Sequence, residues 1–186
     1  MTITRSMVRS AVAAYLDHTP DERGRLARLL AALETSADLT CRTEYQGHVT
    51  CGAVVLDSGG QVLHIHHNAL DRWLLPGGHL ESSDESLPGA ALREVGEETG
   101  IAASLLTPLD GVETVPFDVD VHPIPANPAK DEAAHWHFDL RYAFRIDSVP
   151  EVRLQPEEVS RFGWLDLESV PSPQIRAKLG QIARRA

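Results

Sequence analysis

The sequence predicts an α/β fold that is preceded by a hairpin of two helices. Three observations support this prediction: two apolar stripes at helical spacing near the N-terminus, apolar runs typical of strands after residue 46, and one central helix between the strands. We therefore divide the 186 residues into an N-terminal helical extension, residues 1–46, and an α/β domain, residues 47–186.

The composition is that of an ordinary globular protein with an acidic balance. Apolar residues make up 42% of the chain and charged residues 24%, and the formal net charge is −10. This charge disfavours a nucleic-acid polymer or an anionic membrane as a partner. It does not exclude a nucleotide, because a bound divalent cation can bridge an acidic protein and an acidic ligand.

The two cysteines, Cys41 and Cys51, match neither a zinc motif nor a disulfide framework. The N-terminus lacks the uninterrupted apolar segment of a signal peptide, and no apolar run approaches the roughly 18 residues of a membrane-spanning helix. We therefore expect a cytoplasmic location and no membrane partner.

Residues 4–36 are predicted to form two helices that are separated at residues 18–20. The stripes consist of Met7, Val8, Ala11, Val12 and Leu16 in the first helix and of Leu26, Leu29, Leu30 and Leu33 in the second. Such faces have to be buried, either on the same domain or on a second subunit, so a homodimer remains open. The polar residues 35–46 indicate a linker.

Residues 49–56 and 62–67 are predicted to be strands of a hairpin, because residues 57–60 have the composition of a tight turn. Residues 115–134 are rich in proline and aspartate, and we expect them to form a long loop. Residues 154–186 are predicted to form a loop, a short strand and a helix.

The clearest strand covers residues 135–145, where large apolar side chains alternate with polar ones. His137, Asp139 and Arg141 follow one another on the polar face, and we expect them to contact substrate, with Arg141 suited to bidentate phosphate binding. The alternative is a solvent-exposed outer face. A transition-metal site among the histidines of this strand and of residues 64–67 has no specific spacing to support it.

The central helix is predicted to begin after Ser86, an N-cap residue, and to end at Gly100, which suits a left-handed C-cap. Near its end, Glu94, Glu97 and Glu98 fall within about a 100° arc of the helix surface. Their repulsion, and the unfavourable helix dipole at this end, would be relieved by a divalent cation bound through oxygen. The plainer interpretation is a solvated acidic helix end.

Residues 77–101, GGHLESSDESLPGAALREVGEETGI, resemble the box motif of the Nudix family. The matching positions are Gly78, Glu85, Arg93, Glu94, Val95, Glu97, Glu98, Gly100 and Ile101. The loop before Glu85 is one residue longer than the pattern, so Glu81, Asp84 and Glu85 are alternatives for the leading glutamate.

The resemblance implies an α/β/α sandwich with a mixed sheet, and an enzyme that hydrolyses a diphosphate linkage in a nucleoside diphosphate derivative or a (d)NTP-like compound. It implies Mg²⁺ as the cofactor, with Mn²⁺ as a second possibility. We expect Arg93, Glu94, Glu97 and Glu98 to be catalytic and Gly78, Glu94, Glu97, Glu98 and Glu158 to form the metal site. Glu158 lies six residues before Trp164, where many relatives have an acidic residue, and Glu157 is its alternative. Glu158, His137 and the box glutamates are the candidates for the general base.

Two other functions remain open. One is a nucleotide sensor without turnover, although sensing alone would not require three crowded glutamates. The other is an isopentenyl-diphosphate isomerase-like enzyme, which would use a catalytic cysteine; neither Cys41 nor Cys51 has a matching sequence context. Release of phosphate or pyrophosphate from a panel of diphosphates would separate the three.

Overall fold

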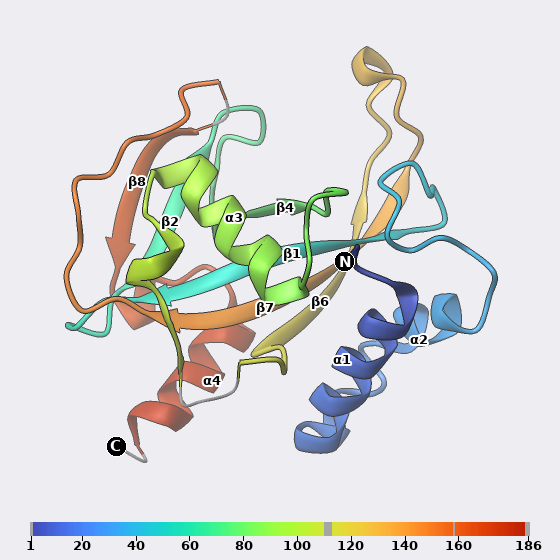
Figure 1. Ribbon diagram of the computed structural model, residues 1–186, viewed down its shortest axis with the longest axis horizontal. Coiled ribbons are helices and arrows are strands. Elements are labelled where there is room, and N and C mark those ends of the chain that lie inside the picture. The colour runs from blue at the N-terminus through green and yellow to red at the C-terminus, as the bar shows by residue number, and fades with distance from the viewer. Residues whose placement is uncertain (1, 110–112, 158, 185–186) are drawn as a thin grey trace. The chain divides into compact units, whose positions relative to one another are not determined.

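The computed structural model describes residues 2–109, 113–157 and 159–184, and Figure 1 shows the chain. The chain forms two compact units, each assembled from three segments. Unit 1 comprises Met1–Gly52, Gly78–Ala90 and Val112–Tyr142, and unit 2 comprises Ala53–Gly77, Ala91–Gly111 and Ala143–Ala186. Three strands and one helix run through both units. The units therefore do not coincide with the division at residue 46 that the sequence suggests, and that division stays a prediction.

Eight strands of the described part form one sheet with the order β3-β2-β1-β7-β5, where β4 pairs with β1, β6 with β7 and β8 with β2. The strands are β1 His48–Leu56, β2 Val62–His67, β3 Arg72–Leu74, β4 Gly77–His79, β5 Thr107–Pro108, β6 Asp118–Ile124, β7 His135–Arg145 and β8 Val159–Leu165. Strands β1 and β7 lie side by side and point in the same direction, whereas β2 pairs antiparallel with β3 and β8 (Figure 1). The sheet is therefore mixed, as predicted.

Four α-helices accompany the strands in the described residues: α1 Arg5–His18, α2 Ala27–Leu33, α3 Leu87–Thr99 and α4 Pro173–Ala183. Short 3₁₀ turns lie at Pro20–Glu22, Ala103–Leu105, Pro128–Lys130 and Leu167–Ser169. No helix in the described ranges is both long and apolar enough to span a bilayer.

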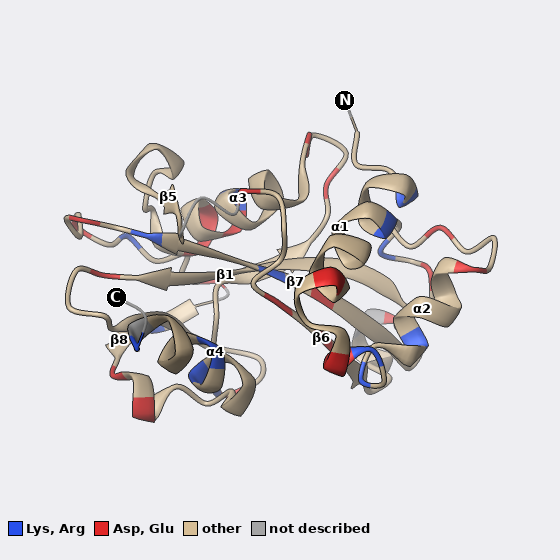
Figure 2. Cartoon of the chain, turned by 90° about the horizontal axis from the view of Figure 1, so that it is seen from below, with Lys and Arg blue, Asp and Glu red and all other residues tan. Residues whose placement is uncertain are grey.

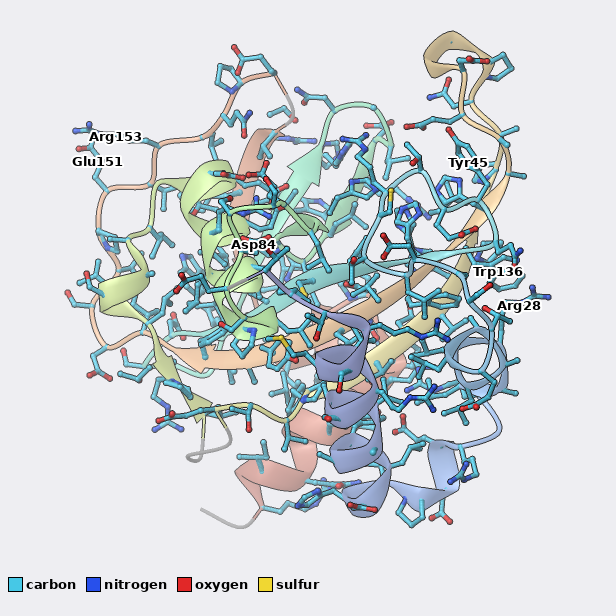
Figure 3. All side chains as sticks on the ribbon, turned by 45° about the vertical axis from the view of Figure 1, so that its right-hand side comes forward. Arg28, Tyr45, Asp84, Trp136, Glu151 and Arg153 are labelled. Carbon is cyan, nitrogen blue, oxygen red and sulfur yellow. The ribbon has the colours of Figure 1, made fainter. Side chains whose placement is uncertain are left out.

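The N-terminal helical hairpin is confirmed, and it packs against its own chain within unit 1. Arg5 donates hydrogen bonds to the backbone oxygens of Leu33 at 2.6 Å and Ala37 at 3.3 Å, so it satisfies carbonyls at and beyond the end of α2. The guanidinium of Arg28 lies 4.2 Å from the centre of the Trp136 ring, as the two labelled side chains in Figure 3 show. The predicted stripe is buried at Val8, Ala11, Val12, Leu16, Leu26, Leu29 and Leu33. The homodimer stays a prediction.

The prediction of a long loop over residues 115–134 is wrong, because this segment contains β6. Strand β6 pairs antiparallel with β7 from Asp118 opposite Arg141 to Ile124 opposite His135. In the described residues β6 pairs with no other strand, and an edge strand tolerates proline at position 123. The aspartates of β6, which disfavour a strand when considered alone, are compensated by an arginine 21–23 residues away in the sequence.

The hairpin predicted for residues 49–67 and the strand and helix predicted near the C-terminus are confirmed. The turn between β1 and β2 is closed by a hydrogen bond from the Gln61 amide to Asp57 Oδ1 at 2.8 Å, and Gly60 has a φ of 81°. Strand β8 pairs with β2 along its length. Helix α4 is capped by Ser172, whose hydroxyl oxygen accepts from the Ile175 amide at 3.3 Å.

Because Leu29 of α2 is fully buried, the Leu29→Ala substitution should lower the free energy of unfolding by about 2–5 kcal/mol. Leu70→Ala is the matched control, since Leu70 is 49% exposed and its substitution should change stability by less than about 0.5 kcal/mol. Urea unfolding of both variants measures the difference. Equal stability of the two variants would show that the hairpin does not pack as described.

Candidate active site

Helix α3 begins and ends as the sequence predicts. The Ser86 hydroxyl accepts a hydrogen bond from the Gly89 amide at 3.1 Å, and the Gly100 amide donates to the Gly96 carbonyl at 2.9 Å. Gly100 has a φ of 71°, a left-handed conformation that glycine adopts without strain. These two ends fix the register of the glutamates near the end of the helix.

The three glutamates of α3 differ strongly in burial. Glu98 is 3% exposed, the side chain of Glu94 is 12% exposed, and that of Glu97 is 47% exposed. Glu98 Oε2 accepts a hydrogen bond from the Gly77 amide at 3.0 Å, so the turn before β4 holds this carboxylate in place. A nearly buried carboxylate is costly unless its charge is compensated.

Arg93 holds the other two glutamates. Its Nη1 donates to Glu94 Oε1 at 2.9 Å and to Glu97 Oε2 at 2.7 Å, and the second contact spans one helical turn. One guanidinium therefore contacts two of the three carboxylates. The formal charge of the four side chains is −2.

The segment before β8 runs beside the end of α3. The Arg153 amide donates to the Thr99 carbonyl at 2.8 Å, and the Gln155 amide donates to the Glu98 carbonyl at 3.4 Å. A side chain at Gly100 would come within 3.2 Å of Arg153. Glu157, which follows this segment, is exposed, and Glu158 lies outside the described residues.

Among the three alternatives for the leading glutamate, Asp84 is buried, with 6% of its surface exposed, whereas Glu81 and Glu85 are exposed. Asp84 Oδ2 accepts a hydrogen bond from the Glu81 amide at 2.7 Å and so closes the turn before α3. Asp84 therefore shapes the loop that contains the additional residue.

Arg141, which the sequence suggested as a free cation for substrate, lies among three aspartates of unit 1. Its guanidinium donates to Asp139 at 2.7 Å, to Asp120 at 3.0 Å and to Asp118 at 3.1 Å. Figure 2 marks acidic positions on β6 in red and basic positions on β7 in blue. Burial alone would lower the pKa of Arg141, but the charges of the three aspartates raise it above its usual value.

A second arginine completes this network. Arg25 lies 3.2 Å from Asp118 Oδ1 and 3.8 Å from Asp120 Oδ1, and it also pairs with Glu22. The Thr50 hydroxyl donates to Asp139 at 3.1 Å. The network therefore joins the helical hairpin to β6 and β7. The contact with substrate that the sequence suggested for Asp139 and Arg141 stays a prediction.

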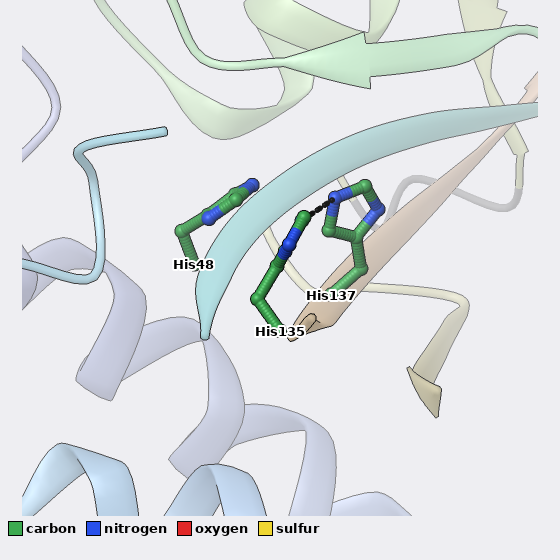
Figure 4. Close-up of side chains that lie close together, drawn as sticks. All are labelled: His48, His135 and His137. Atoms are coloured by element: carbon green, nitrogen blue, oxygen red, sulfur yellow. Dashed lines mark hydrogen bonds between the residues drawn. The ribbon is translucent and has the colours of Figure 1, made fainter. Parts of the chain in front are cut away.

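His137 belongs to a cluster of imidazoles that sequence reasoning found only in part, because His48 and His79 come from distant segments. The ring centre of His48 lies 4.8 Å from that of His135 and 4.9 Å from that of His137 (Figure 4). The ring of His79 is 5.0 Å from His48. Burial, followed by the charges of the neighbouring histidines, lowers the pKa of His137 to about 3.

Residues 47–186 match the family model of the NUDIX domain. The chain belongs to the Nudix family. This match covers three quarters of the chain and includes the box helix with its glutamates. The family that the box residues predicted is therefore confirmed.

Individual Nudix proteins resemble the chain in sequence and in fold. A probable DHNTP pyrophosphohydrolase of Lactococcus lactis is 29% identical over 156 residues, which cover 82% of this chain and 85% of that protein. The structure of the Escherichia coli dihydroneopterin triphosphate pyrophosphohydrolase superposes with a TM-score of 0.56 at 21% identity, covering 74% of this chain and 96% of that one. An Ap4A hydrolase from C. elegans gives a TM-score of 0.55 at 18% identity over the same shares of the two chains.

These similarities confirm the predicted α/β Nudix sandwich and the predicted enzyme class, a Nudix pyrophosphohydrolase. The Nudix match begins at residue 47, one residue before β1. The ligand roles of Gly78, Glu94, Glu97, Glu98 and Glu158 stay predictions.

We expect Arg141→Ala to lower the free energy of unfolding by about 3–5 kcal/mol, because it removes one of the two arginines that compensate the aspartates of this network. Asp118, which loses this partner, has a side chain with no exposed surface. Arg145→Ala is the control, since Arg145 is exposed at the end of the same strand. If urea unfolding gave both variants wild-type stability, the network would have no structural role.

The stability of the protein should depend on pH through Asp120. The contact from His122 lowers the pKa of Asp120, burial opposes it, and the charges of Arg141 and Arg25 add to the lowering. In the unfolded chain the carboxylate of Asp120 is protonated near pH 4, whereas in the folded chain it stays ionised at that pH. Asp120 therefore stabilises the fold above about pH 4, and this stabilisation is lost as the pH falls further.

Asp120→Asn should therefore be less stable than the wild type at neutral pH, and the difference should shrink as the pH falls from about 5 to 2. Urea unfolding across this range measures the difference, with Asp17→Asn as an exposed control. A difference that stayed constant with pH would contradict the lowered pKa.

Proposed function

We propose that this Nudix enzyme hydrolyses a diphosphate linkage in a nucleotide-like small molecule with the help of Mg²⁺, or of Mn²⁺, held by the glutamates of α3. The observation that supports the proposal most directly is the nearly buried carboxylate of Glu98, next to two further glutamates that share one arginine.

The donor set fits a hard divalent cation. Carboxylate oxygens are the ligands that Mg²⁺ prefers, and the four side chains Arg93, Glu94, Glu97 and Glu98 have a formal charge of −2 that one such ion would balance. Glu94 and Glu98 lie one turn apart and are the two more buried glutamates, so they are our preferred direct ligands. Gly78, directly after the turn that contacts Glu98, and Glu158 are proposed as further ligands.

The side chains of α3 have distinct proposed roles. Arg93 fixes the positions of Glu94 and Glu97 through its two hydrogen bonds, and the Gly77 amide fixes Glu98. Glu97, the exposed member, is placed to hold water or to accept its proton, and Glu158 and His137 remain the other candidates for the base. A bound Mg²⁺ would neutralise charge on the phosphate oxygens and favour ionisation of the attacking water.

The proposed substrate is a nucleoside diphosphate derivative or a (d)NTP-like triphosphate. The name of the Lactococcus relative, a probable DHNTP pyrophosphohydrolase, supports the triphosphate within this class. The isomerase alternative has less support, because Cys51 is buried in β1 and Cys41 lies in the turns before that strand. The cytoplasmic location and the contacts of His137, Asp139 and Arg141 with substrate stay predictions.

The test is turnover of a panel of nucleoside triphosphates and nucleoside diphosphate-linked compounds, with release of phosphate and pyrophosphate as the readout. We expect Glu98→Gln to reduce turnover at least about 100-fold, which corresponds to about 2.7 kcal/mol in the barrier. Its amide oxygen can still accept the hydrogen bond from Gly77, so the variant should unfold at the same or higher denaturant concentration than the metal-free wild type.

Glu168→Gln, an exposed glutamate of the 3₁₀ turn after β8, is the matched control and should keep full turnover. Near-normal activity of Glu98→Gln would remove Glu98 from the metal site. Binding of a nucleotide without turnover of any member of the panel would favour the sensor alternative.

A further inference from the structure

We propose that His48, His135 and His137 form a binding site for a borderline divalent transition metal, with Zn²⁺ as the first candidate. The three residues offer ligand nitrogens that all lie within 4.8 Å of one another. They come from the starts of β1 and β7 in unit 1 (Figure 4). The site is built from imidazoles and does not depend on the proposed reaction at the glutamates of α3.

Two of the three rings are fixed with a lone pair available for a metal. Nδ1 of His48 lies 3.2 Å from the Glu44 carbonyl, and Nδ1 of His135 lies 2.8 Å from the Ala133 carbonyl. A carbonyl oxygen can only accept, so each Nδ1 must be the donor and must hold the proton. The neutral rings then have an unprotonated Nε2, and an N–H bonded to a backbone carbonyl is the usual arrangement around a metal-bound histidine.

The third ring already lies at the spacing of two metal ligands. Nε2 of His137 is 3.2 Å from Nε2 of His135, the contact drawn in Figure 4. Two nitrogens bound tetrahedrally to Zn²⁺ at 2.0–2.1 Å are about 3.3 Å apart. In the metal-free state, His137 must donate from Nε2 to the lone pair of His135. Metal binding requires only that this proton move to Nδ1 of His137, with no net release.

The two ring nitrogens of His48 differ in their partners. Its Nε2 is buried and has no hydrogen-bond partner among the described residues, a situation that is rare for a buried polar atom. A cavity of about 100 Å³ adjoins it, and besides the three histidines its lining consists of Arg42, Tyr45, His79, Ile124 and Glu132. This volume accommodates an ion and a water molecule.

The charge state of the rings also suits a metal. Burial and the neighbouring histidines lower the pKa of His48 and of His137, so both rings are neutral at physiological pH. A metal binds the neutral imidazole and would not have to displace a proton from either ring. Imidazole nitrogen favours Zn²⁺, Ni²⁺ or Co²⁺ over Mg²⁺, which prefers oxygen ligands.

Because Zn²⁺ prefers imidazole nitrogen and Mg²⁺ prefers oxygen, Zn²⁺ binding can be measured while Mg²⁺ is in excess. The full chain, purified without a polyhistidine tag and treated with a chelator, is titrated with Zn²⁺ by calorimetry in excess Mg²⁺, which occupies oxygen sites. We expect one Zn²⁺ per chain. His48→Asn and His135→Asn should each weaken Zn²⁺ binding by more than about 100-fold. Loss of a residue that only hydrogen-bonds to a metal ligand already lowers metal affinity by about 10–100-fold, and these variants remove a ligand itself.

Two controls separate this site from other sources of binding. His18→Asn removes an exposed histidine of α1, and Glu98→Gln changes the carboxylates of α3; both should bind Zn²⁺ like the wild type. Zn²⁺ should also raise the melting temperature of the wild type and of these two controls, but not that of the His48 and His135 variants.

X-ray absorption of the wild type with one equivalent of Zn²⁺ tests the proposal even if a variant fails to fold. Imidazole nitrogens at about 2.0–2.1 Å are expected. Coordination by oxygen alone, loss of binding in Glu98→Gln, unchanged binding in folded His48→Asn and His135→Asn, or absence of Zn²⁺ binding by the wild type would each overturn the proposal.

Discussion

Strand β7 places alternate side chains on opposite faces of the sheet, and the rest of this structure depends on that constraint. Phe138, Leu140, Tyr142 and Phe144 are buried on one face. The other face has charged and imidazole side chains, which need partners within the fold. The neighbouring strands β6 and β1 and the N-terminal hairpin supply groups to this network. Arg141 donates hydrogen bonds to three aspartates. His135 is hydrogen-bonded to a backbone carbonyl and to His137.

In helix α3 the charges are not fully compensated by neighbouring side chains, in contrast to those around β7. Its glutamates crowd one face near the C-terminal end, where neither their mutual repulsion nor the helix dipole favours them. Arg93 and the Gly77 amide hold the carboxylates in place but leave an excess of negative charge. In the proposed function, a divalent cation and a phosphorylated substrate would use this excess of negative charge. In β7 and β6, by contrast, arginines neutralise much of the charge of the aspartates.

Local patterns predicted most of the fold. The stripes of α1 and α2, the hairpin of β1 and β2, the alternation of β7 and the caps of α3 each depend on residues a few positions apart, and all were correct. Strand β6 was missed because its aspartates and its single proline are unfavourable in isolation, and the aspartates are compensated by Arg141 on the neighbouring strand. The histidine cluster was incomplete for the same reason, since His48 and His79 lie 87 and 56 residues before His135 in the sequence.

The sequence by itself therefore determined the family, the enzyme class and the glutamates of α3, because a motif within one helix keeps its spacing in any fold that contains that helix. Only the tertiary structure decided what surrounds each charge. It gave Glu98 a buried position beside the Gly77 amide, and it gave Arg141 three carboxylates instead of open solvent. It also brought three imidazoles within reach of one ion. These outcomes depend on strand register and on contacts between distant segments, which the order of residues along the chain does not display.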